Sequence, residues 1–243
     1  MTYISDELRI TGVASIPIGS GPFPIVILNH GYALPSRYKT GEGTRAMSEA
    51  LASRGFITLA SDYRGLGSSD DSSSLNLGIR LEFAIDVLNL AAAARNIPEA
   101  QTGPIGIWGH SLGAELALRA AIVDENVGPV ALWAPISPWM DDLAAYYRLP
   151  ASDSSKNLRA TLSSGNYLGY ANGPIDIHQG EADQVVNPGW AKKIHHALLS
   201  EGIQTTLHLY PDQGHLLDFG SENVISETTE FFTQTLQSAN TLR

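Results

Sequence analysis

A serine between two glycines is the strongest chemical signal in the chain. Residues 109–113 read Gly-His-Ser-Leu-Gly and fit the pattern G-x-S-x-G, in which the serine sits on a sharp turn from a strand into a helix. Small residues two positions either side of Ser111 remove the Cβ atoms that would clash in such a turn. The pattern predicts Ser111 as an exposed nucleophile, although a tight turn without a catalytic role fits it too.

A serine hydroxyl is a weak nucleophile at neutral pH and needs a base. His215 is the best candidate among the seven histidines, because it follows the last predicted strand and Gly214 lets the loop aim its ring. The others lie beside the serine, past the first buried strand, within predicted strands or on a predicted surface helix: His110, His30, His178, His208, His195 and His196. A position within a strand favours a hydrogen-bonded core role for His178.

A carboxylate must hold the base in the correct tautomer and stabilise its charged form. The segment Gly-Glu-Ala-Asp at residues 180–183 follows the predicted strand at 175–178, which places Asp183 at the apex of a loop. Glu181 is the alternative acid, but a solvated loop charge explains it better. Asp183 is therefore predicted as the partner of His215.

Acyl transfer also needs two N–H donors for the oxyanion. The first is the backbone N–H of Leu112, at the start of the helix that follows the serine. Residues 29–32 read Asn-His-Gly-Tyr and follow the first buried strand, and Gly31 allows a close approach of the backbone. We predict the Tyr32 backbone N–H as the second donor. The Tyr32 phenol is explained equally well as a further donor or as a pocket wall.

The elements that must position these residues alternate between apolar strands and helices. Strands are predicted at 8–16, 25–28, 56–60, 105–108, 130–133, 175–178 and 205–210, and helices at 43–54, 79–96, 112–123, 190–199 and 224–236. Strands that are apolar throughout are typical of a parallel sheet covered on both faces. The first strands have no helix between them and should form an antiparallel edge. We predict one α/β domain over residues 1–243, with a mostly parallel sheet of about eight strands and helices on both faces.

Residues 137–173 interrupt this alternation and are rich in aromatic side chains. Unusually long connections in compact domains are often functional, so we predict a small lid or cap insertion here. Five residues are expected to wall an apolar acyl or aryl pocket: His110, Trp133, Trp139, Tyr146 and Tyr167. For any one of the aromatic residues, packing within the lid is an equally good explanation.

Composition excludes several classes of function. The formal net charge is −10, which would repel phosphate backbones and argues against a nucleic-acid partner. No window is long and apolar enough for a membrane span, and residues 1–10 do not read as a signal peptide, so a cytoplasmic protein is expected. The chain has no cysteine, which excludes disulfides and a thiolate nucleophile. A homodimer is compatible with the sequence.

The chain resembles the α/β-hydrolase superfamily over nearly its whole length. The matching segments are residues 30–32, 62–68, 109–113, 180–183 and 214–215, and the order Ser111, Asp183, His215 is the order of that fold. Within the superfamily it looks like the branch of dienelactone hydrolases and prolyl-oligopeptidase-like enzymes, and Tyr32 matches the oxyanion-loop tyrosine of the latter. It departs from dienelactone hydrolases in having a serine rather than a cysteine nucleophile.

The resemblance implies a serine carboxylic-ester hydrolase for small to medium acyl or aryl esters, with no metal or cofactor. A peptidase or amidase, an acyltransferase and a C–C hydrolase share the same triad and stay open. A non-catalytic ligand receptor on the same fold is the alternative from a different class. Arg64 is expected to brace the catalytic edge of the sheet through salt bridges, and Glu115 to be a hydrogen-bonded structural carboxylate.

Overall fold

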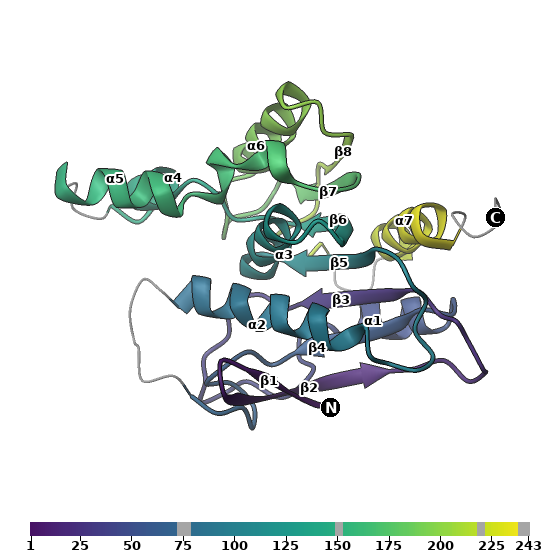
Figure 1. Cartoon of the computed structure of the whole chain (residues 1–243). Helices are drawn as coiled ribbons and strands as arrows, with labels where there is room; N and C mark the ends of the chain where they lie inside the picture. Colours follow the sequence, from purple (N-terminus) through teal and green to yellow (C-terminus); the bar gives the residue numbers. More distant parts are fainter. Residues whose placement is uncertain (72–78, 149–152, 218–221, 238–243) are drawn as a thin grey trace.

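The computed structural model describes residues 1–71, 79–148, 153–217 and 222–237. It contains one eight-stranded sheet in the order β1-β2-β4-β3-β5-β6-β7-β8 (Figure 1). Pairing is antiparallel for β1 with β2 and for β2 with β4, and parallel for every other pair. The strands are β1 (Thr2–Ser5), β2 (Leu8–Ser15), β3 (Ile25–Asn29), β4 (Ile57–Ser61), β5 (Ile105–His110), β6 (Val127–Trp133), β7 (Ile175–Gly180) and β8 (Thr205–Tyr210). The predicted mixed sheet with an antiparallel edge is confirmed.

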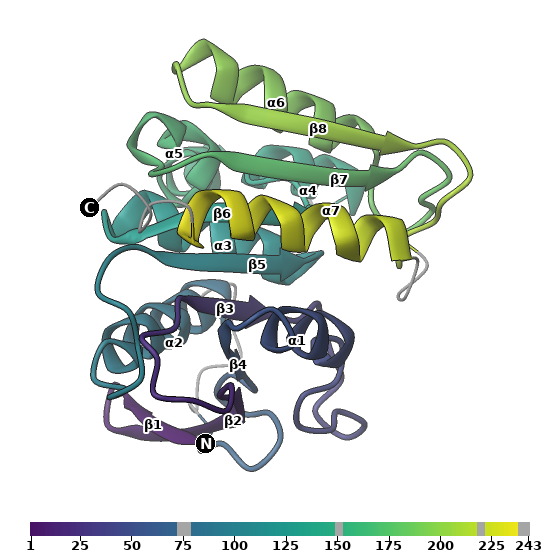
Figure 2. The ribbon, with the colours of Figure 1, turned by 90° about the vertical axis from the view of Figure 1, so that its right-hand side faces the viewer.

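Helices cover both faces of the sheet (Figure 2). One face carries α2 (Ile79–Ala94), α3 (Leu112–Val123) and α6 (Gly189–Ser200), and the other carries α1 (Arg45–Ala52) and α7 (Glu222–Phe232), which continues as a π-helix over Thr233–Gln237. Each face has its own apolar cluster, so the sheet separates two cores. Every residue of β3, β4, β5, β6 and β7 is buried, which explains why these strands are nearly continuous apolar runs.

The segment at 137–173 contains α4 (Met140–Tyr146), α5 (Asp153–Leu162) and two 3-10 turns, Ser164–Asn166 and Leu168–Tyr170. Leu143 and Leu168 bury it against the core on the α3 side. The Ser164 hydroxyl donates to Glu115, which also pairs with Arg119, so the structural role expected for Glu115 is confirmed. None of the helices in the described part of the chain has both the length and the apolarity that crossing a bilayer requires.

The predicted brace at Arg64 is also confirmed. Its guanidinium donates three hydrogen bonds to the buried Asp86 carboxylate of α2, two from Nε at 3.1 Å and one from Nη2 at 2.7 Å, and pairs with Asp6 at 3.2 Å. The Arg64 backbone N–H donates to Asp86 as well, at 2.9 Å. These bonds fix the loop that follows β4 to α2 and to the β1–β2 turn.

Candidate active site

Ser111 occupies a strained turn between β5 and α3. Its φ of 57° and ψ of −116° lie in a region that residues with a Cβ rarely adopt. A Cβ built on Gly109 would lie 2.1 Å from the carbonyl oxygen of Gly113, and one built on Gly113 would lie 2.1 Å from that of Asn29. Only glycine fits at either position, and the close approach that they allow forces Ser111 to the apex of the turn.

Asp183 holds the ring of His215 through a hydrogen bond. The His215 Nδ1 lies 2.8 Å from Asp183 Oδ2, while Asp183 Oδ1 accepts the backbone N–H groups of Val185 and Val186 at 2.8 and 3.0 Å. Burial would raise the pKa of the Asp183 carboxyl, but the His215 bond and the two amides outweigh it and hold the pKa below its ordinary value. Asp183 is thus an ionised carboxylate at neutral pH, with His215 Nδ1–H as its donor.

Ser111 and His215 line the same cavity, of about 450 Å³. In the described part of the chain, the Ser111 hydroxyl and the His215 ring are not hydrogen-bonded to each other. Catalytic hydrogen bonds are often long in substrate-free enzymes and tighten when substrate binds. The arrangement therefore brings a serine hydroxyl and a carboxylate-held imidazole to one cavity, at the carboxyl ends of β5, β7 and β8.

His110 also lines this cavity, and its ring faces the loop of the candidate base. His110 Nε2–H donates to the backbone carbonyl of His215 at 2.8 Å, and the two ring centroids are 4.8 Å apart. Burial lowers the pKa of His110 to about 4, against the opposing effect of that hydrogen bond. At neutral pH His110 is therefore a neutral donor that ties the His215 loop to the end of β5.

The predicted oxyanion donors flank Ser111. Leu112 is the first residue of α3, so its N–H has no acceptor within the helix. On the other side, a Cβ built on Gly31 would lie 3.3 Å from both Ser111 Cβ and His110 Nδ1, which shows how closely the backbone of this loop passes the serine. Tyr32 follows, with a side chain 75% exposed at the cavity.

Four of the predicted pocket residues do not line this cavity. Trp133 lies in the core beneath α7, where its indole N–H donates to Thr228 Oγ1 at 2.9 Å and its ring meets Trp108. The expectation for Trp133 was wrong because every residue of β6 is buried and apolar sequence does not show which face a side chain occupies.

The other three belong to the insertion. Trp139 packs on Gly165 and under the ammonium group of Lys193, and Tyr167 is 40% exposed. Tyr146 contacts the cavity wall, because its hydroxyl donates to the carbonyl of Val185 at 3.1 Å. These aromatic residues pack within and beside the insertion rather than around the serine.

The apolar wall of the cavity comes instead from the loops that carry the predicted polar site residues. Leu34, Val185 and Leu216 line the cavity together with Tyr38. Each of the three aliphatic residues lies on the same loop as a predicted site residue: Leu34 follows Tyr32, Val185 follows Asp183, and Leu216 follows His215. Their position on those loops was the signal that could have identified them.

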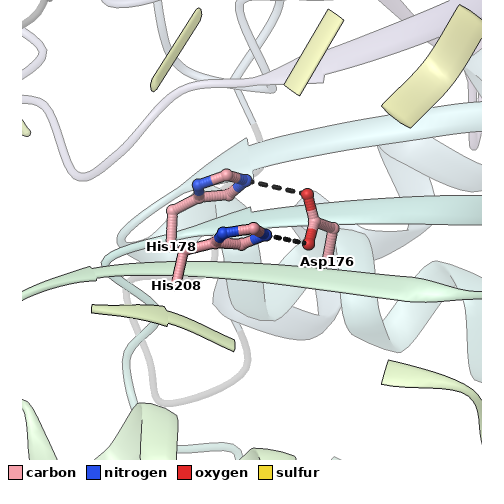
Figure 3. A group of neighbouring side chains, drawn as sticks. All are labelled: Asp176, His178 and His208. Carbon is pink, nitrogen blue, oxygen red and sulfur yellow. Dashed lines mark hydrogen bonds and ion pairs between the residues drawn. The ribbon is translucent and has the colours of Figure 1, made fainter. Parts of the chain in front are cut away.

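A second polar cluster lies on the α7 face of the sheet, at Asp176, His178 and His208 (Figure 3). Each imidazole points its Nε2 at a different oxygen of the carboxylate, at 2.9 Å for His178 and 2.8 Å for His208. The rings stack at 4.6 Å and are within 8° of parallel. Parallel rings direct their nitrogen lone pairs along parallel lines, which do not converge on one metal ion, so we interpret the cluster as a hydrogen-bonded network.

This network reaches the surface through Tyr210 and Glu227. The Tyr210 hydroxyl lies 2.7 Å from His178 Nδ1 and donates to Glu227 at 2.5 Å. Burial would raise the pKa of Asp176, but the bonds from His178 and His208 outweigh it and lower that pKa to about 2. The bond to Asp176 in turn raises the pKa of His208. The core role expected for His178 is confirmed.

Four curated relatives share part of this sequence. The human protein ABHD12B is 27% identical over 187 residues, which is 71% of this chain and 49% of that protein. An uncharacterised 31.7 kDa protein of the Escherichia coli traX-finO intergenic region is 33% identical over 51% of this chain and 42% of its own length. Esterase EstD of Thermotoga maritima is 27% identical over 63% of this chain and 37% of its own length. The matches span less than half of the length of each relative.

Solved structures match nearly the whole chain. Est1E from Butyrivibrio proteoclasticus with bound ferulic acid superposes with a TM-score of 0.78 over 98% of this chain and 99% of its own, at 18% identity. Acetyl xylan esterase 1 from Thermoanaerobacterium superposes with a TM-score of 0.70 over 92% of this chain and 79% of its own, at 23% identity. Pyrococcus horikoshii acylaminoacyl peptidase superposes with a TM-score of 0.79 over 97% of this chain and 41% of its own, at 18% identity. At these identities the likeness establishes the α/β-hydrolase fold.

The family assignment comes from sequence. The model of the dienelactone hydrolase family matches residues 38–223, a segment that includes Ser111, Asp183 and His215. This match covers more than half of the chain and agrees with the fold and with the resemblance in its motifs. The chain therefore belongs to the dienelactone hydrolase family.

Proposed function

We propose that this chain is a serine carboxylic-ester hydrolase that acts on small to medium acyl or aryl esters through Ser111, His215 and Asp183. The observation that supports it most is a single cavity that holds a serine at a strained strand–helix turn and an imidazole bonded to a buried carboxylate. An alcohol, a base and an acid that orients the base are the parts that acyl transfer requires.

Hydrolysis would proceed through an acyl-enzyme. The Ser111 oxygen attacks the ester carbonyl while His215 Nε2 takes its proton, and the N–H groups of Leu112 and Tyr32 donate to the oxyanion. His215 then returns the proton to the leaving alcohol as the carbonyl re-forms. Water enters, loses a proton to His215 and attacks the acyl carbon, and Ser111 leaves with that proton. Asp183 stays ionised and stabilises the imidazolium in both steps.

The lining of the cavity supports an apolar acyl or aryl group. Leu34, Val185 and Leu216 surround the approach to Ser111, and the ring of Tyr38 adds an aromatic wall. Apolar walls around a few polar groups are typical of small-molecule sites. Est1E with ferulic acid and the acetyl xylan esterase have the same fold, which is compatible with an ester substrate.

Turnover of p-nitrophenyl acetate by the wild type and Ser111→Ala tests this proposal. We expect the variant to lose about 10³-fold or more in kcat, since removing one member disables the triad as a unit. Ser53→Ala is the matched control, because Ser53 is exposed at the end of α1, where its hydroxyl donates to the carbonyl of Ala50. Equal turnover by the wild type and Ser111→Ala would contradict the proposal.

An amidase would use the same three side chains. The matched pair of p-nitrophenyl acetate and p-nitroacetanilide separates the two activities, because the acyl group is the same and only the leaving group differs. We expect the ester to be preferred by kcat/KM. A higher kcat/KM on the anilide would replace the esterase with an amidase, and saturable ligand binding without turnover of either substrate would indicate a receptor.

A further inference from the structure

Asp62 is a fully buried carboxylate directly after β4. It accepts hydrogen bonds from three hydroxyl groups: Thr11 at 2.6 Å, Tyr38 at 2.8 Å and Thr40 at 2.8 Å. Thr11 lies on β2, whereas Tyr38 and Thr40 lie on the loop between β3 and α1. One carboxylate thus joins the sheet to this loop, and neither the triad nor the Arg64 brace uses it.

The loop that Asp62 anchors forms one wall of the candidate active site. Residues 30–34 line the cavity, and so do Arg37, Tyr38, Glu42 and Gly43. Between Asn29 and Arg45 this loop has turns but no helix or strand. The backbone hydrogen bonds within this loop close local turns, so side-chain anchors are needed to fix the loop to the sheet.

His30 sets the direction of one peptide unit in this loop. Burial lowers the pKa of His30, so the imidazole is neutral and carries one N–H. Its Nδ1 lies 2.7 Å from the carbonyl oxygen of Gly31, closer than its Nε2 lies to the carbonyl of Asp62 at 3.4 Å. The Gly31 carbonyl and the Tyr32 N–H belong to the same planar trans peptide and point in opposite directions. Holding that carbonyl therefore aims the Tyr32 N–H away from His30.

Tyr38 connects the carboxylate to His30. Its ring stacks on the His30 imidazole with centroids 4.6 Å apart, and Tyr63 packs on the same imidazole at 4.4 Å. The Tyr38 hydroxyl is the group that reaches Asp62. A fixed phenol thus limits how far the imidazole can turn or shift.

We propose that Asp62 is a positioning residue for the oxyanion site: through the Tyr38 hydroxyl and ring it holds His30, and through His30 it holds the Gly31–Tyr32 peptide whose N–H binds the oxyanion. This inference rests on the proposed esterase function. Asp62 touches no reacting atom. Thr40 adds a second tie from the same carboxylate to the loop, and Thr11 ties it to the sheet.

The test compares bonds to the same carboxylate. Tyr38→Phe and Thr40→Val release the loop, and Tyr38→Phe keeps the ring that lines the cavity. Thr11→Val is the matched control, because it removes a bond to the same carboxylate but on the β2 side. For p-nitrophenyl acetate we expect Tyr38→Phe to lower kcat about tenfold with KM within about twofold, since losing an oxyanion donor outright costs about 10²–10³ and a misaligned donor costs less. Asp62→Asn should lower kcat further.

The inhibition constant of a trifluoromethyl ketone, which forms a tetrahedral adduct with the serine, gives a second measurement. A general loss of stability would not change this constant. It should rise in Tyr38→Phe by the same factor by which kcat/KM falls. In Thr11→Val, kcat and the inhibition constant should stay within about twofold of the wild type while the melting temperature falls. If Asp62→Asn does not fold, Tyr38→Phe and Thr40→Val decide the question.

Two results would overturn the inference. One is wild-type kcat and inhibitor affinity in both Tyr38→Phe and Thr40→Val, and the other is an equal loss of kcat in Thr11→Val and Tyr38→Phe. Ser111→Ala, measured in the same series, keeps the two proposals apart. Turnover that survives Ser111→Ala would remove the esterase proposal itself, whereas its loss there together with intact loop variants would remove only the role of Asp62.

Discussion

The strained backbone at Ser111 depends on neighbours that carry no side chain. A non-glycine residue with positive φ persists only where its surroundings determine it. Here those surroundings are the two glycines on either side, whose missing Cβ atoms let β5, α3 and the end of β3 approach one another. The geometry at Ser111 thus requires glycine at both positions, and the spacing of these glycines is visible in a short sequence pattern.

Gly113→Ala tests this dependence. Its Cβ would overlap the Asn29 carbonyl, so the start of α3 has to shift. We expect a stability loss of about 1–3 kcal/mol, as for other overpacked sites, together with a large loss of kcat. Gly214→Ala is the control, because a Cβ there meets no atom within 4 Å. Activity in Gly214→Ala should survive, and a fully active Gly113→Ala variant would show that the turn is not constrained as described.

His110 allows a test of which histidine titrates during catalysis. With a pKa of about 4, it is neutral throughout the range in which an ordinary histidine titrates. We predict that His110→Ala lowers kcat by about tenfold, because the His215 loop loses an anchor, but leaves the midpoint of the acid limb of kcat/KM against pH in place. A displaced midpoint would mean that His110 itself must be deprotonated for activity.

At the scale of elements, the sequence predicted those features that have a local pattern, namely the buried strands and the residues that follow them. The three predicted triad residues each follow a strand, and strand ends are marked by apolar runs that stop at glycines or polar residues. Trp133 was misplaced because the alternation of side chains cannot be read in β6, where all seven residues are buried. β1 was missed since it is a four-residue edge strand. The anchoring of a loop by Asp62 depends on contacts between distant segments, which no spacing along the chain reveals.

The Arg64–Asp86 pair is an element-scale brace with a measurable contribution. Both side chains are buried, so Arg64→Ala leaves an unpaired carboxylate in α2. We expect the free energy of unfolding to fall by about 3–5 kcal/mol in urea titrations. The exposed pair of Arg9 and Asp70 provides the comparison, and Arg9→Ala should cost less than about 1 kcal/mol. Equal effects of the two variants would show that burial does not set the contribution.

At the scale of the whole molecule, the candidate active site lies at the carboxyl ends of the strands, and the polar network lies on the face of the sheet that α7 covers. His178 and His208 are register neighbours on β7 and β8, and Glu227 and Thr228 reach them from the last helix. The sequence showed that His178 lies within a strand, but the network could not be predicted, because it depends on strand register and on where α7 packs. The same network anchors Tyr210, the last residue of β8 before the His215 loop.

Asp176 links this network to the pH dependence of stability. Its folded pKa of about 2 lies below the ordinary 3.8, so its contribution is present above about pH 4 and is lost as pH falls toward 2. The raised pKa of His208 has the opposite sign: its contribution is present below the ordinary value and is lost as pH rises through the folded value. The bond between His208 and Asp176 contributes to both pKa shifts, and the bond from His178 adds to that of Asp176.

Urea unfolding of Asp176→Asn at a series of pH values tests this linkage. We predict a loss on the order of 2 kcal/mol near pH 5, since one pKa unit corresponds to about 1.4 kcal/mol. The acid limb between pH 4 and 2 should be shallower than in the wild type. Parallel stability curves for the two proteins would show that Asp176 titrates normally in the folded state.

Covalent labelling with diisopropyl fluorophosphate tests the central claim most directly, because the reagent phosphorylates a serine oxygen that a neighbouring base activates and releases fluoride. We predict one phosphoryl group per chain, located by peptide mass spectrometry on Ser111, with loss of ester turnover in proportion to labelling. In His215→Ala the labelling rate should fall by about 10³-fold or more. Modification of a different residue, or an unchanged rate in His215→Ala, would contradict the account.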